Sequence, residues 1–335
     1  MGSRKSSPTK QLQRMQIRRD RLFSLGKLQA PAHELPPGLV VMVDDMKRLS
    51  QAIAVVPAGF RDELCADRDT YGRFFPHNFA ADHDPSCSAA VLPPAKVKRI
   101  RDRATLWEKR FEDEASWNME VHHHILRAVC RPKGRRAAVD FISCTTARIS
   151  PTFIPSGERG KMVDSCLFID PAAYGATAEE RIQDLCSRQP HGSINHTDHM
   201  PLFGQPIAVS VETKRSAVDW DNATLQTGTW QAAQLRCLSQ LATLAATSYG
   251  RESLGSPTAG VAVIDFVPGI IIQGHDWHLV ASVHTGGVTT FRTKIPIGTT
   301  ETVLGVYKIL AALTYLVRWS ENVYWPCFKQ TIQLG

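Results

Sequence analysis

From residue 105 to the C-terminus, helical and strand-like segments alternate in an order that only mixed folds accommodate. The predicted elements, in chain order, are a helix at 105–129, strands at 137–143, 146–154, 161–169 and 206–214, a helix at 222–247, strands at 260–267 and 277–284, and a helix from about Thr300. This order predicts an α/β (α+β mixed) sheet with helices packed on it. The long excursion at 171–205, with its own short helix, is expected to form a rim.

Three parts are predicted along the chain: a basic disordered arm at 1–30, an extension and linker at 31–95, and the main domain at 96–335. Between Arg4 and Lys27, eight Lys or Arg residues stand against the single acid Asp20, which is typical of a disordered arm. Such an arm either only adds solubility or binds phosphates, and the charge does not decide between the two. The linker is expected within 74–95, which is rich in Pro, Asp, His and Ser.

Composition excludes several classes of protein. The 335 residues are 43% hydrophobic and 21% charged, as in ordinary globular proteins, and the N-terminus lacks the apolar core of a secretory signal. We therefore expect an intracellular protein, nuclear or cytoplasmic, without a membrane span. Eight irregularly spaced cysteines without a C-x-x-C pair argue against a zinc ribbon or a disulfide scaffold. A net charge of +7 favours a polyanionic partner only weakly.

The strand at 206–214, PIAVSVETK, carries the first candidate site residues. Side chains alternate between the two faces of a strand, so Glu212 and Lys214 share one face. An acid and a lysine two residues apart are usually only an exposed cross-strand ion pair. Asp164, near the start of the strand at 161–169, changes this interpretation, because pairing of the two strands would bring a second carboxylate beside Glu212.

Two converging carboxylates are the usual protein ligands of Mg²⁺, with waters and a substrate phosphate completing the shell. We therefore expect Asp164 and Glu212 to bind Mg²⁺ or Mn²⁺. Lys214, expected to be partly exposed and to add little stability, would orient the attacking water and hold the phosphate. Glu120, on the first long helix, is a third candidate ligand, although a solvent-facing acid fits its position equally well. Gln226, near the start of the next long helix, is placed to hydrogen-bond the water, the phosphate or a carboxylate.

Other candidate motifs are weaker. The adjacent histidines at 122–124 point about 100° apart on a helix and cannot converge on one ion. A second set, His191, His196 and His199, lies in a polar loop, and such loops are more often simply polar than zinc-binding. The sequence contains no Gly-Lys-Ser/Thr phosphate-binding loop and no G-x-S-x-G elbow.

Several segments match one pattern together, although none does so alone. They are SWNMEVHHHIL (116–126), KMVDSCLFI (161–169), SINHTDHMPL (193–202), PIAVSVETKR (206–215), the segment from Gln226 to Trp230, and YWP (324–326). Over roughly residues 30–330, the chain resembles the PD-(D/E)XK nuclease-like proteins found widely in fungal genomes. The resemblance implies a restriction-endonuclease-like αβββαβ core with flanking helices. It also implies roles for five residues: Asp164, Glu212 and Lys214 as the D…(D/E)xK signature, Glu120 as the helix acid and Gln226 as the accessory residue.

Two departures from the family pattern bear on this site. Val163 replaces the signature proline, and 48 positions separate Asp164 from Glu212, so the adjacency of their strands must be tested. The leading hypothesis is metal-dependent hydrolysis of phosphodiester bonds in nucleic acid, with DNA placed ahead of RNA as the partner. The alternative is a catalytically silent module on the same fold that binds nucleic acid or protein, since sites on a fold can decay.

Overall fold

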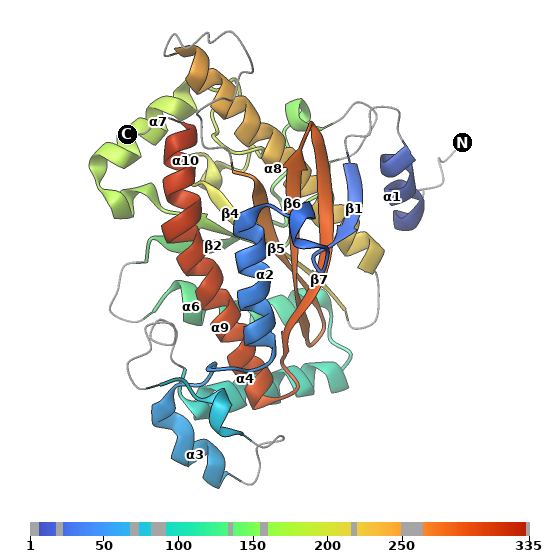
Figure 1. The fold of residues 1–335 in the computed structure, drawn as a ribbon, viewed down its shortest axis with the longest axis vertical. Coiled ribbons are helices and arrows are strands. Elements are labelled where there is room, and N and C mark those ends of the chain that lie inside the picture. Colours follow the sequence, from blue (N-terminus) through green and yellow to red (C-terminus); the bar gives the residue numbers. More distant parts are fainter. Residues whose placement is uncertain are drawn as a thin grey trace.

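The computed structural model describes residues 7–17, 23–67, 74–81, 92–132, 137–154, 160–215, 220–248 and 264–332. Within these residues, seven strands form one mixed sheet in the order β1-β7-β6-β5-β4-β3-β2 (Figure 1). The strands are β1 (Phe23–Lys27), β2 (Val139–Ser143), β3 (Ser165–Ile169), β4 (Ile207–Lys214), β5 (Phe266–Gln273), β6 (Asp276–Thr285) and β7 (Val288–Thr299). Helices cover both faces of the sheet, so the predicted mixed α/β fold is confirmed.

The centre of the sheet has the predicted αβββαβ order. Its elements are α6 (His123–Cys130), β2, β3, β4, α8 (Trp220–Ser248) and β5. β2, β3 and β4 pair antiparallel as a meander. β4 and β5 are parallel, and parallel neighbours need a crossover connection, which contains α8. β6 and β7 then extend the sheet beyond β5.

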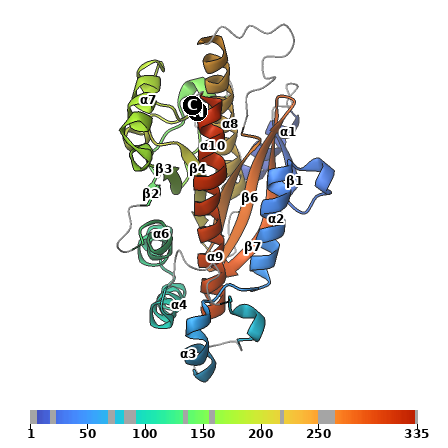
Figure 2. The same ribbon diagram turned by 60° about the vertical axis from the view of Figure 1, so that its left-hand side comes forward.

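Different helices cover the two faces of the sheet (Figure 2). α8 lies on β4 and β5, while α2 (Pro37–Ser50) and α9 (Val303–Trp319) lie on β7 from the opposite side. α9 continues through the π-turn η9 (Ser320–Tyr324) into α10 (Trp325–Thr331). β4 is buried at every position except its last, because both of its faces are covered.

Among the residues that the structure describes, one helical stretch, Val303–Thr331, is long and apolar enough by composition to cross a membrane. However, 67% of its most apolar part is buried inside the fold, where α9 packs on β7. A helix whose apolar side chains already contact protein in this way is typical of a core helix.

The predicted single helix at 105–129 is wrong in its middle. α4 (Pro94–Lys109) ends just before Phe111, whose φ of 54° lies in the left-handed region that interrupts a helix. Asp113 then caps a new helix, since its Oδ1 accepts a hydrogen bond from the Ser116 backbone N–H at 2.8 Å. The new helix runs, in order, through α5 (Glu114–Trp117), the π-turn η5 (Asn118–His122) and α6.

The prediction of a disordered arm at 1–30 is wrong for the parts that the structure describes. α1 (Pro8–Ile17) packs on α8, and Leu12 is buried in the same apolar cluster as Phe23. β1 pairs in parallel with β7. The basic composition conceals a few apolar side chains, and these become buried once α8 and β7 provide a surface. The remainder of the predicted arm, residues 1–6 and 18–22, lies outside the described residues.

The predicted extension shares its core with the main domain. Leu39, Met42 and Met46 of α2 are buried in the same apolar cluster as residues of α4, β4 and α9. α3 (Arg61–Ala66) follows on the chain. Much of the predicted linker, residues 82–91, lies outside the described residues, so the boundary near residue 95 stays a prediction.

Two predicted strands differ from the structure. The segment at 146–154 forms a 3-10 turn, η6 (Pro151–Phe153), and a single bridge at Ile149 instead of a strand, because Pro151 has no N–H to donate to a ladder. The strand predicted at 260–267 corresponds to β5, which begins only at Phe266; residues 260–263 lie outside the described part of the chain. The excursion does contain its short helix, α7 (Ala176–Ser187).

Candidate active site

Glu212 and Lys214 lie at the end of β4, on the face that α8 covers. Two residues before Glu212, the Ser210 hydroxyl accepts a hydrogen bond from Gln231 of α8 at 2.9 Å, which identifies the face. Alternation along the strand repeats this orientation at positions 212 and 214. The Lys214 Nζ lies 2.5 Å from Glu212 Oε1, so the two side chains do meet on one face.

Asp164 directly precedes β3, the strand next to β4, and lies beside the end of β4 that carries Glu212. Ser165, the first residue of β3, pairs with Val211, and the Asp164 N–H donates to the Val211 carbonyl at 3.1 Å. Continued by one residue, this antiparallel register places Asp164 next to Glu212, and the negative charge of Asp164 acts on Glu212. The 48-position gap therefore does not separate the strands, because the excursion containing α7 leaves the sheet and returns to it.

The Asp164 carboxylate is held in place by the residue between the two signature positions. Its Oδ2 accepts hydrogen bonds from the Thr213 N–H at 2.7 Å and from the Thr213 Oγ1 at 2.8 Å. The Thr213 carbonyl in turn accepts from Lys214 Nζ at 2.7 Å. The orientations of Asp164 and Lys214 are thus coupled through one threonine.

Lys214 is more enclosed than the sequence suggested. Only 10% of its side chain is exposed, and its ammonium lies between two carboxylates, Glu212 at 2.5 Å and Glu114 Oε2 at 3.6 Å. Glu212 itself is fully buried. The pair is therefore not the exposed surface ion pair that an E-x-K strand usually forms.

Glu114, rather than the predicted Glu120, is the acid that the helical segment brings to Lys214. Glu120 instead faces α4, where its carboxylate lies 3.8 Å from the Arg103 guanidinium. The two acids are six positions apart, and the π-turn η5, which contains Glu120, changes the helical phase between them. The capped start at Asp113, recognisable as D-E-A-S in the sequence, is the signal that would have pointed to Glu114.

The electrostatics of this cluster favour an added cation. Burial raises the pKa of Glu212 well above its usual value, and the negative charge of Asp164 adds to this rise, while Lys214 opposes it. Burial also raises the pKa of Glu114. Burial alone would lower the pKa of Lys214, but the surrounding carboxylates, chiefly Glu212, raise it, so the lysine stays charged. Three carboxylates thus share one ammonium.

The donor atoms fit Mg²⁺ or Mn²⁺ with a small set of protein ligands. Glu212 Oε2 is buried and has no hydrogen-bond partner among the described residues. Within the same residues, no three His, Cys, Asp or Glu side chains are grouped as a complete metal site. Two carboxylates, those of Asp164 and Glu212, nonetheless suit Mg²⁺, which keeps several waters.

The loop histidine His196 is buried against Trp230, and burial lowers its pKa to about 3.

Gln226 reaches the same edge of the sheet from α8. Its Nε2 donates to the Met162 carbonyl at 3.2 Å, two residues before Asp164. Its Oε1 is buried and without a hydrogen-bond partner among the described residues. The side chain is therefore anchored at one end and has a free acceptor at the other.

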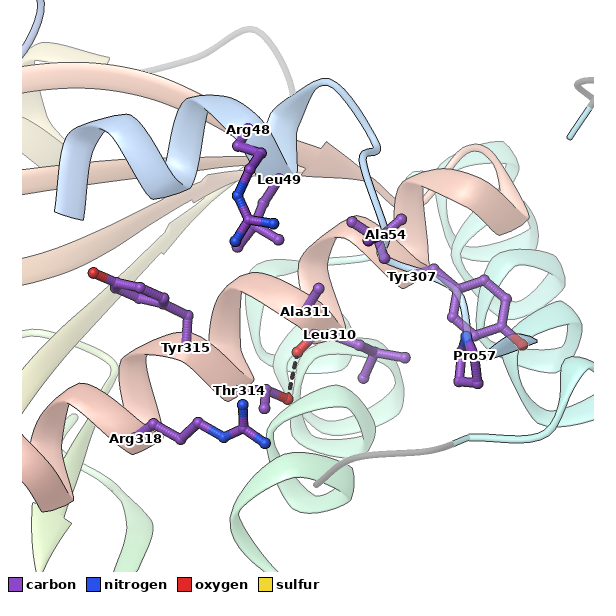
Figure 3. A pocket seen from close by; sticks show the side chains of 11 residues that line it. Arg48, Leu49, Ala54, Pro57, Tyr307, Leu310, Ala311, Thr314, Tyr315 and Arg318 are labelled. Carbon is purple, nitrogen blue, oxygen red and sulfur yellow. Dashed lines mark hydrogen bonds between the residues drawn. The ribbon is translucent and has the colours of Figure 1, made fainter. Parts of the chain in front are cut away.

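A separate cavity of about 70 Å³ lies between α2 and α9 (Figure 3). Arg48 and Arg318 stand at one end of it, near Tyr315, and apolar residues such as Leu310 line the rest. These helices cover the sheet face opposite to that of Glu212. This cavity is distinct from the carboxylate cluster, and none of the described residues that line it is an acid.

A family model of the PD-(D/E)XK nuclease superfamily matches residues 63–325. The chain belongs to this superfamily. No curated protein and no solved structure matches it. The matched range includes every residue of the cluster described above: Glu114, Asp164, Glu212, Lys214 and Gln226. In this PD-(D/E)XK chain, Asp164 stands directly before β3, and the neighbouring strand β4 carries the E-x-K sequence from Glu212 to Lys214.

Proposed function

We propose that this PD-(D/E)XK protein hydrolyses phosphodiester bonds of nucleic acid in a metal-dependent reaction at Asp164, Glu212 and Lys214. One observation supports the proposal above the others. A fully buried carboxylate, Glu212, has one oxygen on Lys214 and the other without a partner among the described residues, and it feels the charge of Asp164. Burying a carboxylate without partners is costly, so such an arrangement is expected where a ligand completes it.

Asp164 and Glu212 would hold Mg²⁺ or Mn²⁺. When bound, a divalent cation of this kind supplies a Lewis acid and lowers the pKa of a bound water.

The remaining steps belong to side chains of the chain itself. Lys214, kept charged by its carboxylate neighbours, would neutralise a phosphate oxygen of the substrate and orient the attacking water. Glu114 Oε2, whose pKa is raised chiefly by burial, is placed to accept or return a proton next to Lys214. The free Oε1 of Gln226 would accept a hydrogen bond from the water.

A cleavage assay tests the proposal. The metal-stripped full chain would be supplied with Mg²⁺, Mn²⁺ or no cation and with single- and double-stranded DNA and RNA. We expect cleavage only with a cation, and a loss of about 10²-fold or more in Glu212→Gln and Lys214→Gln, which remove the ligand and the charge. Circular dichroism would confirm that the variants fold. A wild-type protein that binds nucleic acid yet never cleaves it with either cation would contradict the proposal in favour of a silent binding module.

A further inference from the structure

A line of paired residues runs across the sheet from Glu212 of β4, through β5, to β6. Glu212 pairs with Ile271 of β5, and Ile271 pairs with His278 of β6. Paired residues share a face, so His278 lies on the Glu212 side of the sheet. Neighbouring strands are about 4.8 Å apart, which places the two backbones about 10 Å from each other.

The first residue of α8 packs on this row. The Trp220 indole meets the His278 imidazole edge-on, with ring centroids 5.4 Å apart at 74°. From β7, the Lys294 ammonium lies over the Trp220 ring, 4.2 Å from its centroid. Trp220 is half-buried and Lys294 is exposed, so solvent reaches both. We call these two residues the Trp220–Lys294 ledge.

The ledge has features that an ordinary cation–π pair on a surface lacks. His278 is 9% exposed as a residue, and its buried Nδ1 atom has no hydrogen-bond partner among the described residues, so the indole covers a polar atom that the protein leaves unsatisfied. The ledge also lies beside the proposed reacting carboxylates, on the same face. His278, on which Trp220 packs, has its backbone about 10 Å from that of Glu212, so a nucleotide on the ledge would lie within a few nucleotides of the carboxylates.

We propose that the ledge binds a nucleotide close to the scissile phosphate, with its base unpaired and stacked on Trp220 and a phosphate paired with Lys294. The inference rests on the proposed function and specifies its substrate class. Bases within a duplex are stacked on both faces and cannot offer a face to an indole, whereas bases of a single strand can. The protein should therefore prefer single-stranded segments or unpaired ends.

Binding measurements test the ledge without requiring cleavage. Fluorescence anisotropy would follow a labelled single strand and the blunt duplex of the same sequence, with Mg²⁺, using full-length protein that carries Glu212→Gln. Onto this background we would add Trp220→Leu, Trp220→Phe or Lys294→Gln. Lys47→Gln is the matched control, since it removes one exposed charge from α2 on the other face.

Trp220→Leu should weaken single-strand binding by about 5- to 100-fold, the usual effect of losing one stacked base, and change duplex binding less than twofold. Trp220→Phe should restore most of the affinity, because phenylalanine can still stack. Lys294→Gln should reduce the salt slope for single strands by about 0.7, and Lys47→Gln should leave it unchanged. Thermal unfolding would show whether each variant is folded.

The inference is overturned if folded Trp220→Leu binds single strands like the parent, if it loses both substrates equally, or if the parent binds no single strand. Should Trp220→Leu fail to fold, Lys294→Gln against Lys47→Gln decides the matter through the salt slope. A protein that binds single strands through Trp220 but never cleaves them retains the ledge and loses the proposed function. A protein that cleaves with unaltered preference after Trp220→Leu loses only the ledge.

Discussion

At the residue scale, the ion pair of Lys214 and Glu212 differs from the surface pair expected of an E-x-K strand end. The lysine is 10% exposed and the glutamate is fully buried, so solvent screens the pair poorly. Removing one partner of a buried pair leaves an uncompensated charge, which typically costs about 3–5 kcal/mol. Glu212 can avoid part of that cost by taking up a proton.

Lys214→Ala should therefore lower stability in a pH-dependent manner, and not by the small amount expected from sequence. Without the ammonium, the pKa of Glu212 rises further above its unfolded value, so the folded state binds the extra proton. Stability is then lost as pH rises from the unfolded pKa of Glu, about 4.3, towards the raised folded pKa. Thermal unfolding at pH 5 and pH 8 should show the larger loss relative to wild type at pH 8. An equal loss at both would mean that Glu212 is not involved.

The two acids of the helical segment give a matched pair of variants. Glu114→Gln should reduce cleavage by about 10-fold or more, because it removes the carboxylate next to the Lys214 ammonium. Glu120→Gln should stay within about twofold of wild type, because Glu120 contacts Arg103. Rates would be measured in Mg²⁺ with excess substrate. The reverse ranking would restore Glu120 as the helix acid.

At the scale of elements, the path of the chain between α4 and α6 determines which acid reaches the site. The left-handed Phe111 and the capping residue Asp113 restart the helix, and the π-turn η5 adds a further change of phase before α6. π-turns within helices are frequently found at functional sites. The N-terminal elements do not contribute to the site. α1 packs on α8, and β1 pairs with β7.

Docking of α1 predicts a stability cost for one of its residues. Leu12→Ala should destabilise the protein by about 2 kcal/mol or more, because Leu12 is 5% exposed and packs in the cluster that contains Phe23. Gln13→Ala, at the exposed neighbouring position, should change stability by less than about 0.5 kcal/mol. Urea unfolding would measure both. Equal and small effects would show that α1 is a mobile arm in solution.

At the scale of the whole molecule, cation binding and folding are linked through the carboxylate cluster. A ligand that binds only the folded state stabilises it by about 2.7 kcal/mol at a hundredfold excess over its Kd. Here the cation would also replace the proton that burial favours on Glu212. Folding stability, metal concentration and pH therefore depend on one another.

Mg²⁺ should raise the unfolding temperature more at pH 8 than at pH 5, because protons compete with the cation for Glu212 whose pKa is raised. In Glu212→Gln the stabilisation should disappear. Differential scanning calorimetry with and without chelator measures both effects. Stabilisation that persists in Glu212→Gln would place the cation elsewhere.

Sequence alone determined the properties that depend on the local backbone. Alternation with a period of two placed Glu212 and Lys214 on one face, and the order of periodic segments predicted a mixed α/β sheet with helices packed on it. These features follow from each segment's own conformation, so no knowledge of distant residues was needed. Asp164 was also identified, although its partner strand lies beyond a long excursion.

Only the tertiary structure decided which residues from distant segments meet. The burial of Lys214, the choice of Glu114 over Glu120, and the docking of α1 each depend on surfaces supplied by other elements. The same holds for Trp220 and Lys294, which are 74 positions apart. They meet because the first residue of α8 packs on β6 and β7. Such contacts arise from burial of apolar surface, which is non-directional and leaves no period in the sequence.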